Sequence, residues 1–390
     1  MENIYQIQKK MGNIFNRFFV DKVKMLRETT TMEPSTNPVN RLKSWLEHRN
    51  TVPNFTLKRI NVKILRKILK QMKGKMSFGT DGIDSYSLKL AGPLVEEALL
   101  HLVNLSIDSG LFANQWKPQL IFPTHKKGSK NDVKNFRPVS HLIEVGKIVE
   151  YAVYYQVLEH FTSHSLFHEN HHGSLAGHST ATALVQLVDM WLRASEDKKL
   201  SATLLLDQTA AYDLVDHKIF LDKLEVYNFH FTSIGWFKSY LSGRTQQVQV
   251  ESKLSQQLDT FDHGVPQGSI LGGLIFIIFS NDLPASCPLG DSVMYVDDDT
   301  DVVSDDNSEI LSQKIQFKAD CSTSWLKDNR MCVSGAKSKL LIMGTKALKA
   351  SRKAEQILVK VRHGNSDLPN SALPQNSTLY SVISYRINFG

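Results

Sequence analysis

Residues 292–304 read SVMYVDDDTDVVS, in which two runs rich in Val, Met and Tyr enclose a cluster of aspartates. This pattern predicts two strands joined by a tight acidic turn. Because closely packed carboxylates repel one another, the cluster favours a bound divalent cation that neutralises them. A solvated acidic loop is the simpler alternative. A calcium loop is excluded, because Val302 stands where that loop needs Gly and Ser308 where it needs a bidentate Glu.

The composition indicates a folded, intracellular protein. The chain has 390 residues, 42% hydrophobic and 22% charged, enough to bury a large core in two or three subdomains. The formal charge of +7 favours a polyanionic partner, although only weakly. The three cysteines lack metal-binding spacing and a disulfide framework, which predicts a reducing compartment, nucleus or cytoplasm. No signal peptide opens the chain, so secretion is not expected, and the longest apolar run, 274–279, is too short to cross a membrane.

Hydrophobic periodicity predicts the order of helices and strands. Helices are expected over 4–27, 61–73, 88–110, 145–160, 181–194, 219–241, 270–281 and 308–328. Besides the two strands around the aspartates, strands are expected over 120–123, 202–206, 245–250 and 339–343. Residues 29–38 are interpreted as a polar linker, and the Ser-, Asn- and Pro-rich tail from residue 364 as a segment of little order.

Asp207 follows the apolar run 202–206, which is typical of a strand buried on both faces. A carboxylate there is unfavourable unless it is paired or bound to a metal. Taken alone, Asp207 is most simply an N-cap for a helix starting near Thr209. The second acidic site, at Asp297 and Asp298, favours another hypothesis. If the two strands are neighbours in one sheet, these carboxylates could together hold two Mg²⁺ ions for nucleotidyl transfer.

Six motifs follow one another along the chain: TDGI (80–83), HKKG (125–128), NFRPVS (135–140), LDQTAAYD (206–213), GVPQGSILG (264–272) and YVDD (295–298). With SYLSGR at 239–244, their order and spacing resemble the reverse transcriptase domain of non-LTR (LINE-type) retrotransposons over about residues 75–345. The resemblance implies an α+β right-hand polymerase fold, with an antiparallel palm sheet backed by helices and fingers mainly from residues 75–200. It divides the chain into an N-terminal helical extension (1–74), fingers and palm (75–343), and a truncated thumb with a polar tail (344–390).

The resemblance also implies a metal site. Asp207 and Asp297 would be catalytic residues that bind two Mg²⁺ or Mn²⁺ ions, with Asp298 as a third catalytic and metal-binding carboxylate. The third aspartate of the cluster leaves the register ambiguous. Tyr-x-Asp-Asp selects Asp297 and Asp298, whereas a family-like Asp-Asp-Thr would select Asp298 and Asp299.

A second set of residues would bind the nucleotide, again by resemblance. Arg137 would contact the triphosphate, since its planar guanidinium suits phosphate oxygens. The ring of Tyr212 would lie under the incoming sugar and exclude a 2′ hydroxyl. Gln267 would lie beside the pair formed by template and nucleotide, where Gly268 permits close approach of the backbone.

Several parts of the chain depart from the family pattern. The segment that reads Gln-His-Gly-Phe-Arg in relatives reads HHGSL here, at 171–175. The thumb region is short and no endonuclease precedes the domain, which suggests a fragment or a decayed copy. Either Lys337 or Lys339 falls near the position of the lysine that protonates pyrophosphate in this family, and the sequence does not distinguish them.

The first hypothesis is therefore an RNA-directed DNA polymerase that uses an RNA template, a DNA primer and deoxynucleoside triphosphates, without a membrane partner. The alternative is a catalytically inactive, nucleic-acid-binding remnant of the same fold. The retained aspartates favour the polymerase, and the short thumb favours the remnant. A different two-carboxylate phosphotransferase is disfavoured, because it would not explain the GVPQG loop at 264–268.

Overall fold

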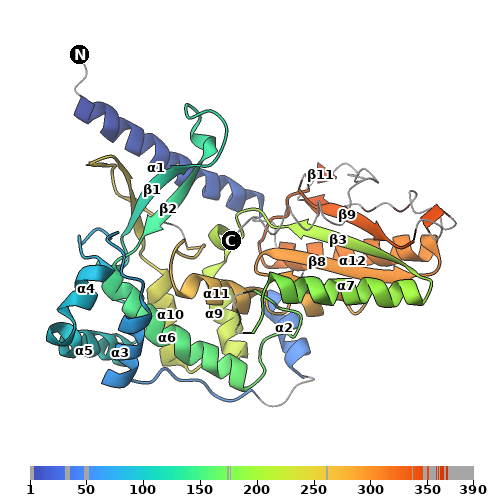
Figure 1. Cartoon of the computed structure of the whole chain (residues 1–390), viewed down its shortest axis with the longest axis horizontal. Coiled ribbons are helices and arrows are strands. Elements are labelled where there is room, and N and C mark those ends of the chain that lie inside the picture. Colours follow the sequence, from blue (N-terminus) through green and yellow to red (C-terminus); the bar gives the residue numbers. More distant parts are fainter. Residues whose placement is uncertain are drawn as a thin grey trace. The chain divides into compact units, whose positions relative to one another are not determined.

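The computed structural model describes residues 4–30, 36–47 and 52–345, except Ser174, Ala176, Phe261 and Ala336. It also describes a few positions between 349 and 367. The chain divides into two compact units that interleave along the sequence (Figure 1). Unit 1 comprises Met1–Glu28, Arg49–Leu166 and Tyr212–Phe279, and unit 2 comprises Thr29–His48, Phe167–Ala211 and Ser280–Gly390. This division differs from the consecutive domains expected from the sequence. The expected thumb and tail lie largely outside the described residues.

Unit 1 combines helices with a mixed sheet. Its helices are α1 (Ile4–Thr29), α3 (Val62–Gln71), α4 (Ser85–Ala91), α5 (Pro93–Ser109), η1 (Asn114–Trp116), η2 (Val133–Asn135), α6 (Glu144–Ser163), α8 (Ala211–Leu214), α9 (His217–Val226), α10 (Phe231–Leu241) and α11 (Leu271–Ser280). Its strands are β1 (Gln119–His125), β2 (Phe136–His141), β4 (Thr245–Val250), β5 (Lys253–Leu254) and β6 (Leu258–Asp259). Strand β1 pairs antiparallel with β2 and parallel with β4.

Helix α1 packs on this sheet through only part of its predicted apolar stripe, since Ile7, Met11 and Ile14 are exposed. Phe15 and Phe19 are buried against Ile121 of β1 and Val248 of β4. The stripe also carries one polar residue, Asn16, whose amide donates to Ser255 Oγ at 3.0 Å. The segment expected to be a separate extension therefore contributes to the core of unit 1.

The helix predicted over 88–110 is two helices, α4 and α5. The break falls at Gly92, whose φ of +40° suits glycine, and Pro93 begins α5 at the first helical position.

None of the described helices is by itself long and apolar enough to span a bilayer. Only α4 and α5 together, bent by 113°, meet the criteria of length and composition.

Strand β2, which contains Pro138, was not predicted from the sequence. It lies at the edge of the sheet, in the order β2-β1-β4-β5, where Pro138 is opposite Pro123. An edge strand tolerates proline, since the missing N–H group can face away from the neighbouring strand.

Unit 2 is built on an antiparallel four-stranded sheet in the order β7-β8-β3-β9. Its strands are β3 (Leu200–Asp207), β7 (Asp291–Tyr295), β8 (Asp298–Asp305) and β9 (Lys339–Met343), and a separate pair is formed by β10 (Arg362–His363) and β11 (Ser366–Asp367). Its helices are α2 (Pro38–Glu47), α7 (Thr180–Glu196), η3 (Pro284–Ser286) and α12 (Ser308–Asp328). Helices α7 and α12 both pack on the four-stranded sheet, and the central strand β3 is buried from Leu200 to Leu206. The α+β class expected from the sequence is confirmed.

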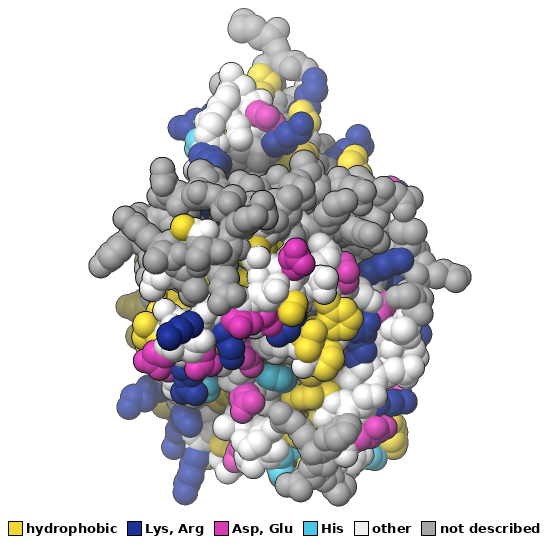
Figure 2. Space-filling view, turned by 90° about the vertical axis from the view of Figure 1, so that its right-hand side faces the viewer, with side chains coloured by type: hydrophobic (Ala, Val, Ile, Leu, Met, Phe, Trp, Pro, Cys, Tyr) yellow, Lys and Arg dark blue, Asp and Glu magenta, His cyan; other side chains and the backbone are white. Residues whose placement is uncertain are grey.

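The face of the molecule in Figure 2 mixes basic with acidic side chains around a small hydrophobic patch. Among the described residues on this face, the positive charges do not form a continuous strip. The net charge of +7 is therefore not concentrated here.

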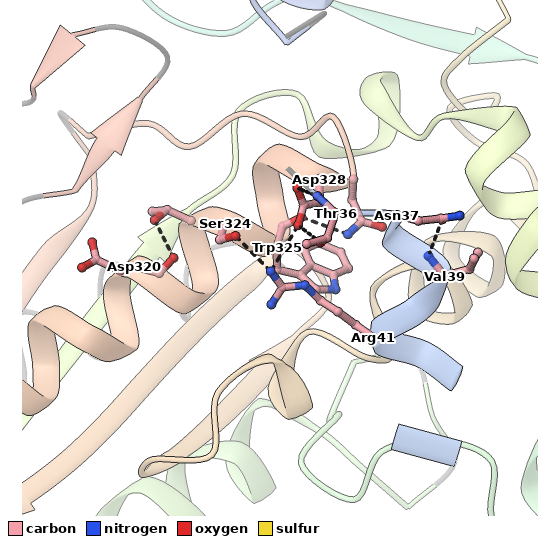
Figure 3. Close-up of polar contacts among 10 residues, drawn as sticks. Thr36, Asn37, Val39, Arg41, Asp320, Ser324, Trp325 and Asp328 are labelled. Atoms are coloured by element: carbon pink, nitrogen blue, oxygen red, sulfur yellow. Dashed lines mark hydrogen bonds and ion pairs between the residues drawn. The ribbon is translucent and has the colours of Figure 1, made fainter. Parts of the chain in front are cut away.

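Helix α2 begins within the segment that we interpreted as a linker, and that interpretation was wrong for its last residue, Pro38. Asn37 caps the helix, since its Oδ1 accepts from Val39 N at 3.2 Å. Asp328, at the end of α12, holds this segment (Figure 3). Its carboxylate accepts from Thr36 Oγ1 at 2.7 Å and forms an ion pair with Arg41 at 3.1 Å. These partners lie almost three hundred positions away, so local pattern could not predict them.

Candidate active site

The aspartate cluster forms the predicted hairpin in unit 2. Strands β7 and β8 are joined by Val296 and Asp297, and Tyr295 pairs with Asp298. Val296 has a φ of +58°, which is unusual for a β-branched residue, so the surrounding structure must hold the turn.

Part of that support comes from residues 170–173. Met294 N donates to Asn170 O at 2.9 Å, and His172 N donates to Met294 O at 2.8 Å, so the segment runs along β7. A Cβ atom on residue 173 would lie only 2.5 Å from Val296 and would clash with it. Glycine at this position avoids the clash. The HHG sequence thus packs directly against the aspartate turn.

The strand register brings two of the predicted carboxylates together. Asp207 at the end of β3 is directly opposite Asp298 at the start of β8. Directly opposed residues project from the same face of a sheet. Asp297 precedes Asp298 in the turn, whereas Asp299 projects from the other face and is 1% exposed. Their roles as metal ligands stay a prediction.

Asp207 and Asp298 are the two carboxylates here that could take part in holding a divalent cation. Within the described part of the chain, no three His, Cys, Asp or Glu side chains form a group that could hold a metal ion. Proteins usually bind Mg²⁺ through one or two carboxylates together with water and substrate phosphates. The pair Asp207 and Asp298 fits that mode.

Lys337, one of the two candidate lysines, contacts Asp207. Its Nζ lies 3.3 Å from Asp207 Oδ1, on the loop before β9. That loop is tied to the end of β3, because Ser334 N donates to Asp207 O at 2.8 Å and Asp207 N donates to Ser338 Oγ at 3.3 Å. Lys339 instead lies in β9, opposite Leu205. The geometry therefore favours Lys337 for a role beside Asp207.

Sequence reasoning missed a buried ion pair beneath the hairpin. Asp301 Oδ1 lies 3.5 Å from Lys318 Nζ of α12, and both side chains are fully buried. Ser292 Oγ donates to Asp301 at 2.6 Å and Ser322 Oγ at 2.7 Å. Burial raises the pKa of Asp301, while Lys318 and the two hydroxyls act in the opposite direction. The alternation of side chains along a strand was the one signal in the sequence, because it places Asp299 and Asp301 on the same face, away from Asp298.

Unit 1 holds the residues expected to bind the nucleotide. Gln267 Nε2 donates to Asp213 Oδ1 at 2.9 Å, and Val265 N donates to Tyr212 O at 2.9 Å, so the Gly/Pro loop lies against the start of α8. Burial raises the pKa of Asp213, and the bond from Gln267 opposes that shift. The ring of Tyr212 stacks on Phe276 with centroids 5.0 Å apart.

Arg137 and Gly268 complete the set in unit 1. Arg137 is exposed on β2, opposite Thr124. Gly268 has a φ of +80°, and a Cβ atom there would lie 3.1 Å from Ser140 O, at the far end of β2. The positive φ favours glycine, and a Cβ atom would lie tightly against this carbonyl oxygen. Close approach of this backbone to the nucleotide pair stays a prediction.

His171, the first residue of the HHGSL segment, is fully buried. Its Nε2 lies 3.4 Å from Ser280 Oγ. Burial is the main cause that lowers the pKa of His171 to about 3, and neighbouring histidines add to it. The pKa of His171 in the folded protein is below that of a histidine in the unfolded chain. The neutral ring of His171 therefore contributes to the free energy of unfolding, and this contribution is fully present above about pH 6.5. It is lost as the pH falls towards the pKa of the folded state.

We expect the free energy of unfolding of the wild type to fall by about 2 kcal/mol more than that of His171→Gln between about pH 7.5 and 5. Glutamine at this position cannot take up a proton in the unfolded chain. Urea unfolding at the two pH values measures the difference, with His101→Gln, at an exposed position, as the control that should follow the wild type. An equal loss in wild type and His171→Gln would contradict the prediction.

Comparisons with known proteins match the part of the chain that carries the residues described above. Residues 124–363 match the family model described as reverse transcriptase (RNA-dependent DNA polymerase). The chain is 30% identical over 239 residues to the probable RNA-directed DNA polymerase from transposon BS of Drosophila melanogaster, covering 60% of this chain and 26% of that protein. It is 31% identical over 221 residues to the probable RNA-directed DNA polymerase from transposon X-element of the same organism, covering 56% and 24%. It is 28% identical over 237 residues to the RNA-directed DNA polymerase from mobile element jockey, also of Drosophila melanogaster, covering 60% and 26%. The chain thus spans about a quarter of the length of these relatives.

Proposed function

Because the chain belongs to the reverse transcriptase (RNA-dependent DNA polymerase) family, we propose that it is the RNA-directed DNA polymerase domain of a retrotransposon-derived protein. It would extend a DNA primer on an RNA template with deoxynucleoside triphosphates, inside the cell. The observation that supports this most directly is the register of β3 and β8, which sets Asp207 opposite Asp298. Both residues lie within the region that matches the family.

In this proposal Asp207, Asp297 and Asp298 are the catalytic carboxylates and hold two Mg²⁺ ions. When bound, the ions would activate the primer 3′ hydroxyl and stabilise the leaving pyrophosphate. Asp297 is presented by the turn, and the turn is supported by Gly173. Lys337, beside Asp207, is the candidate proton donor to pyrophosphate.

Arg137, Tyr212, Gln267 and Gly268 are proposed to bind the nucleotide. Arg137 offers an exposed guanidinium to the triphosphate. The ring of Tyr212 would discriminate against a 2′ hydroxyl, and its stacking on Phe276 limits its movement. The bond from Gln267 to Asp213 holds the loop that would lie beside the template–nucleotide pair.

The fold supports a right-hand assignment at the level of its sheets. The sheet β7-β8-β3-β9 with α7 and α12 would be the palm, since it carries Asp207 and the hairpin. The hairpin β1–β2 and helices α4 and α5 before it would belong to the fingers. A thumb would come from residues after 343.

The test is primer extension by the purified chain on poly(rA) annealed to oligo(dT), with dTTP and Mg²⁺. We expect template-dependent products that disappear when EDTA removes the metal, because carboxylates alone cannot stabilise the charge on pyrophosphate. Binding of the same duplex, measured by fluorescence anisotropy, is the parallel readout. Duplex binding without any extension would contradict the proposal and support the alternative of an inactive, nucleic-acid-binding remnant.

A further inference from the structure

Helix α11, which follows the Gly/Pro loop in unit 1, begins at a buried carboxylate. Glu150 of α6 is 2% exposed, and its Oε2 accepts from Ile270 N at 2.6 Å and from Leu271 N at 3.3 Å. The first N–H groups of a helix lack partners within the helix, and they carry partial positive charge. Burial raises the pKa of Glu150, whereas Arg244 and the two N–H groups act in the opposite direction. Glu150 therefore supplies a hydrogen-bond acceptor at the start of α11, and in its ionised form the sign of charge that this end prefers.

The other end of α11 meets a buried cation. Lys223 of α9 is fully buried, and its Nζ donates to Phe279 O at 2.6 Å. The same Nζ lies 4.8 Å from the centroid of the Phe279 ring. A cation is favourable at a helix C-terminus, where the carbonyl groups carry partial negative charge.

Each end of α11 is thus contacted by an ionisable side chain that is itself buried. Burying a charge is unfavourable unless it is well partnered. Helix α11 consists of small and apolar residues apart from Ser280. Glu150 accepts hydrogen bonds at the start of this helix, and Lys223 donates one near its end.

Between these two ends α11 carries Phe276, the residue on which Tyr212 stacks. The two rings are 5.0 Å apart and inclined by only 21°. One residue of a helix rises 1.5 Å along its axis. If α11 slid along its axis by about this distance, the Phe276 ring would no longer stack squarely on Tyr212.

We infer that Glu150 and Lys223 are positioning residues that fix α11, and that through Phe276 they set the orientation of Tyr212 and thereby the selection of deoxyribose over ribose. The inference rests on the proposed function, in which Tyr212 contacts the sugar. Neither residue would touch the nucleotide, so each acts only through the helix.

The first arm of the test needs no activity. Amide hydrogen exchange of residues 264–280 should be about tenfold faster in Glu150→Gln and Lys223→Met, because each change loosens one end of α11. The matched controls are Glu159→Gln on α6 and Lys218→Met on α9, both at exposed positions. Unchanged exchange in Glu150→Gln and Lys223→Met would overturn the inference.

The second arm measures kcat and KM for dTTP and UTP. In Glu150→Gln and Lys223→Met the ratio of kcat/KM for dTTP to that for UTP should fall about tenfold, mainly through a lower KM for UTP, while kcat for dTTP changes little. Phe276→Leu should lower the ratio similarly without faster exchange at the ends of α11. General loss of structure would lower kcat for both nucleotides instead.

Tyr212→Val separates the two ideas. If it lowers the ratio and the two positioning variants do not, the inference is overturned and the proposed function stands. If the wild type incorporates neither nucleotide, the proposed function is overturned and the sugar-selection role with it. In that case the exchange arm still shows whether Glu150 and Lys223 hold α11.

Discussion

Primer extension by Asp207→Asn should fall by about 10³-fold or more, while the affinity for the primer–template changes little. The amide has the shape of the carboxylate but not its charge, and a lost metal ligand removes several kcal/mol of transition-state stabilisation. Template affinity comes mainly from contacts to backbone phosphates, which this change leaves in place. Asp298→Asn, at the position opposite Asp207, should behave in the same way.

Two further variants test the register of the aspartate cluster. Asp297→Asn should also abolish extension, whereas Asp299→Asn should be mild, because Asp299 projects from the opposite face of β8. Extension rates, duplex binding by anisotropy and thermal unfolding should be measured on each protein. Full activity of Asp297→Asn together with loss in a folded Asp299→Asn would move the site and reject the assignment.

Lys318→Met should lower the free energy of unfolding by about 3–5 kcal/mol at neutral pH. The substitution leaves the Asp301 carboxylate buried without a cation beside it, although the hydroxyls of Ser292 and Ser322 still donate to it. Replacing both members, in Lys318→Met with Asp301→Asn, should restore most of the loss, because no uncompensated charge then remains.

The loss in Lys318→Met should also depend on pH in a defined direction. Without the lysine, burial raises the pKa of Asp301 in the folded state. A raised pKa of an acid in the folded state favours the folded protein at low pH, and this stability is lost as the pH rises through that pKa. The deficit should therefore shrink when urea unfolding is repeated near pH 5.

The control for this pair is Lys314→Met on the same helix. Lys314 forms an ion pair with Asp305 at 2.6 Å, but its side chain is 36% exposed. Partly exposed pairs contribute at most about 1 kcal/mol. An equally small effect of Lys318→Met would contradict the prediction, because the buried pair would then stabilise unit 2 no more than this partly exposed pair does.

The sequence by itself determined the elements whose signals are local. Strand β4 and helix α12 have the bounds that periodicity predicted, as does β9. The hairpin around the aspartates could be predicted for the same reason, since alternating apolar residues and a short acidic turn lie within a few positions of one another. The order of the motifs was also enough to predict the family, which the match over residues 124–363 confirms.

The tertiary structure alone decided which of these residues meet. The register of β3 and β8 depends on hydrogen bonds between strands about ninety positions apart, and a slip of one residue would turn Asp298 to the other face. Lys337 rather than Lys339 contacts Asp207 because the loop before β9 is tied to the end of β3. Helix α2 depends on Asp328, and α1 became part of unit 1 through Phe15 and Phe19. Such contacts depend on burial and on long-range pairing, whereas periodicity along the chain reports only the face that each element will bury.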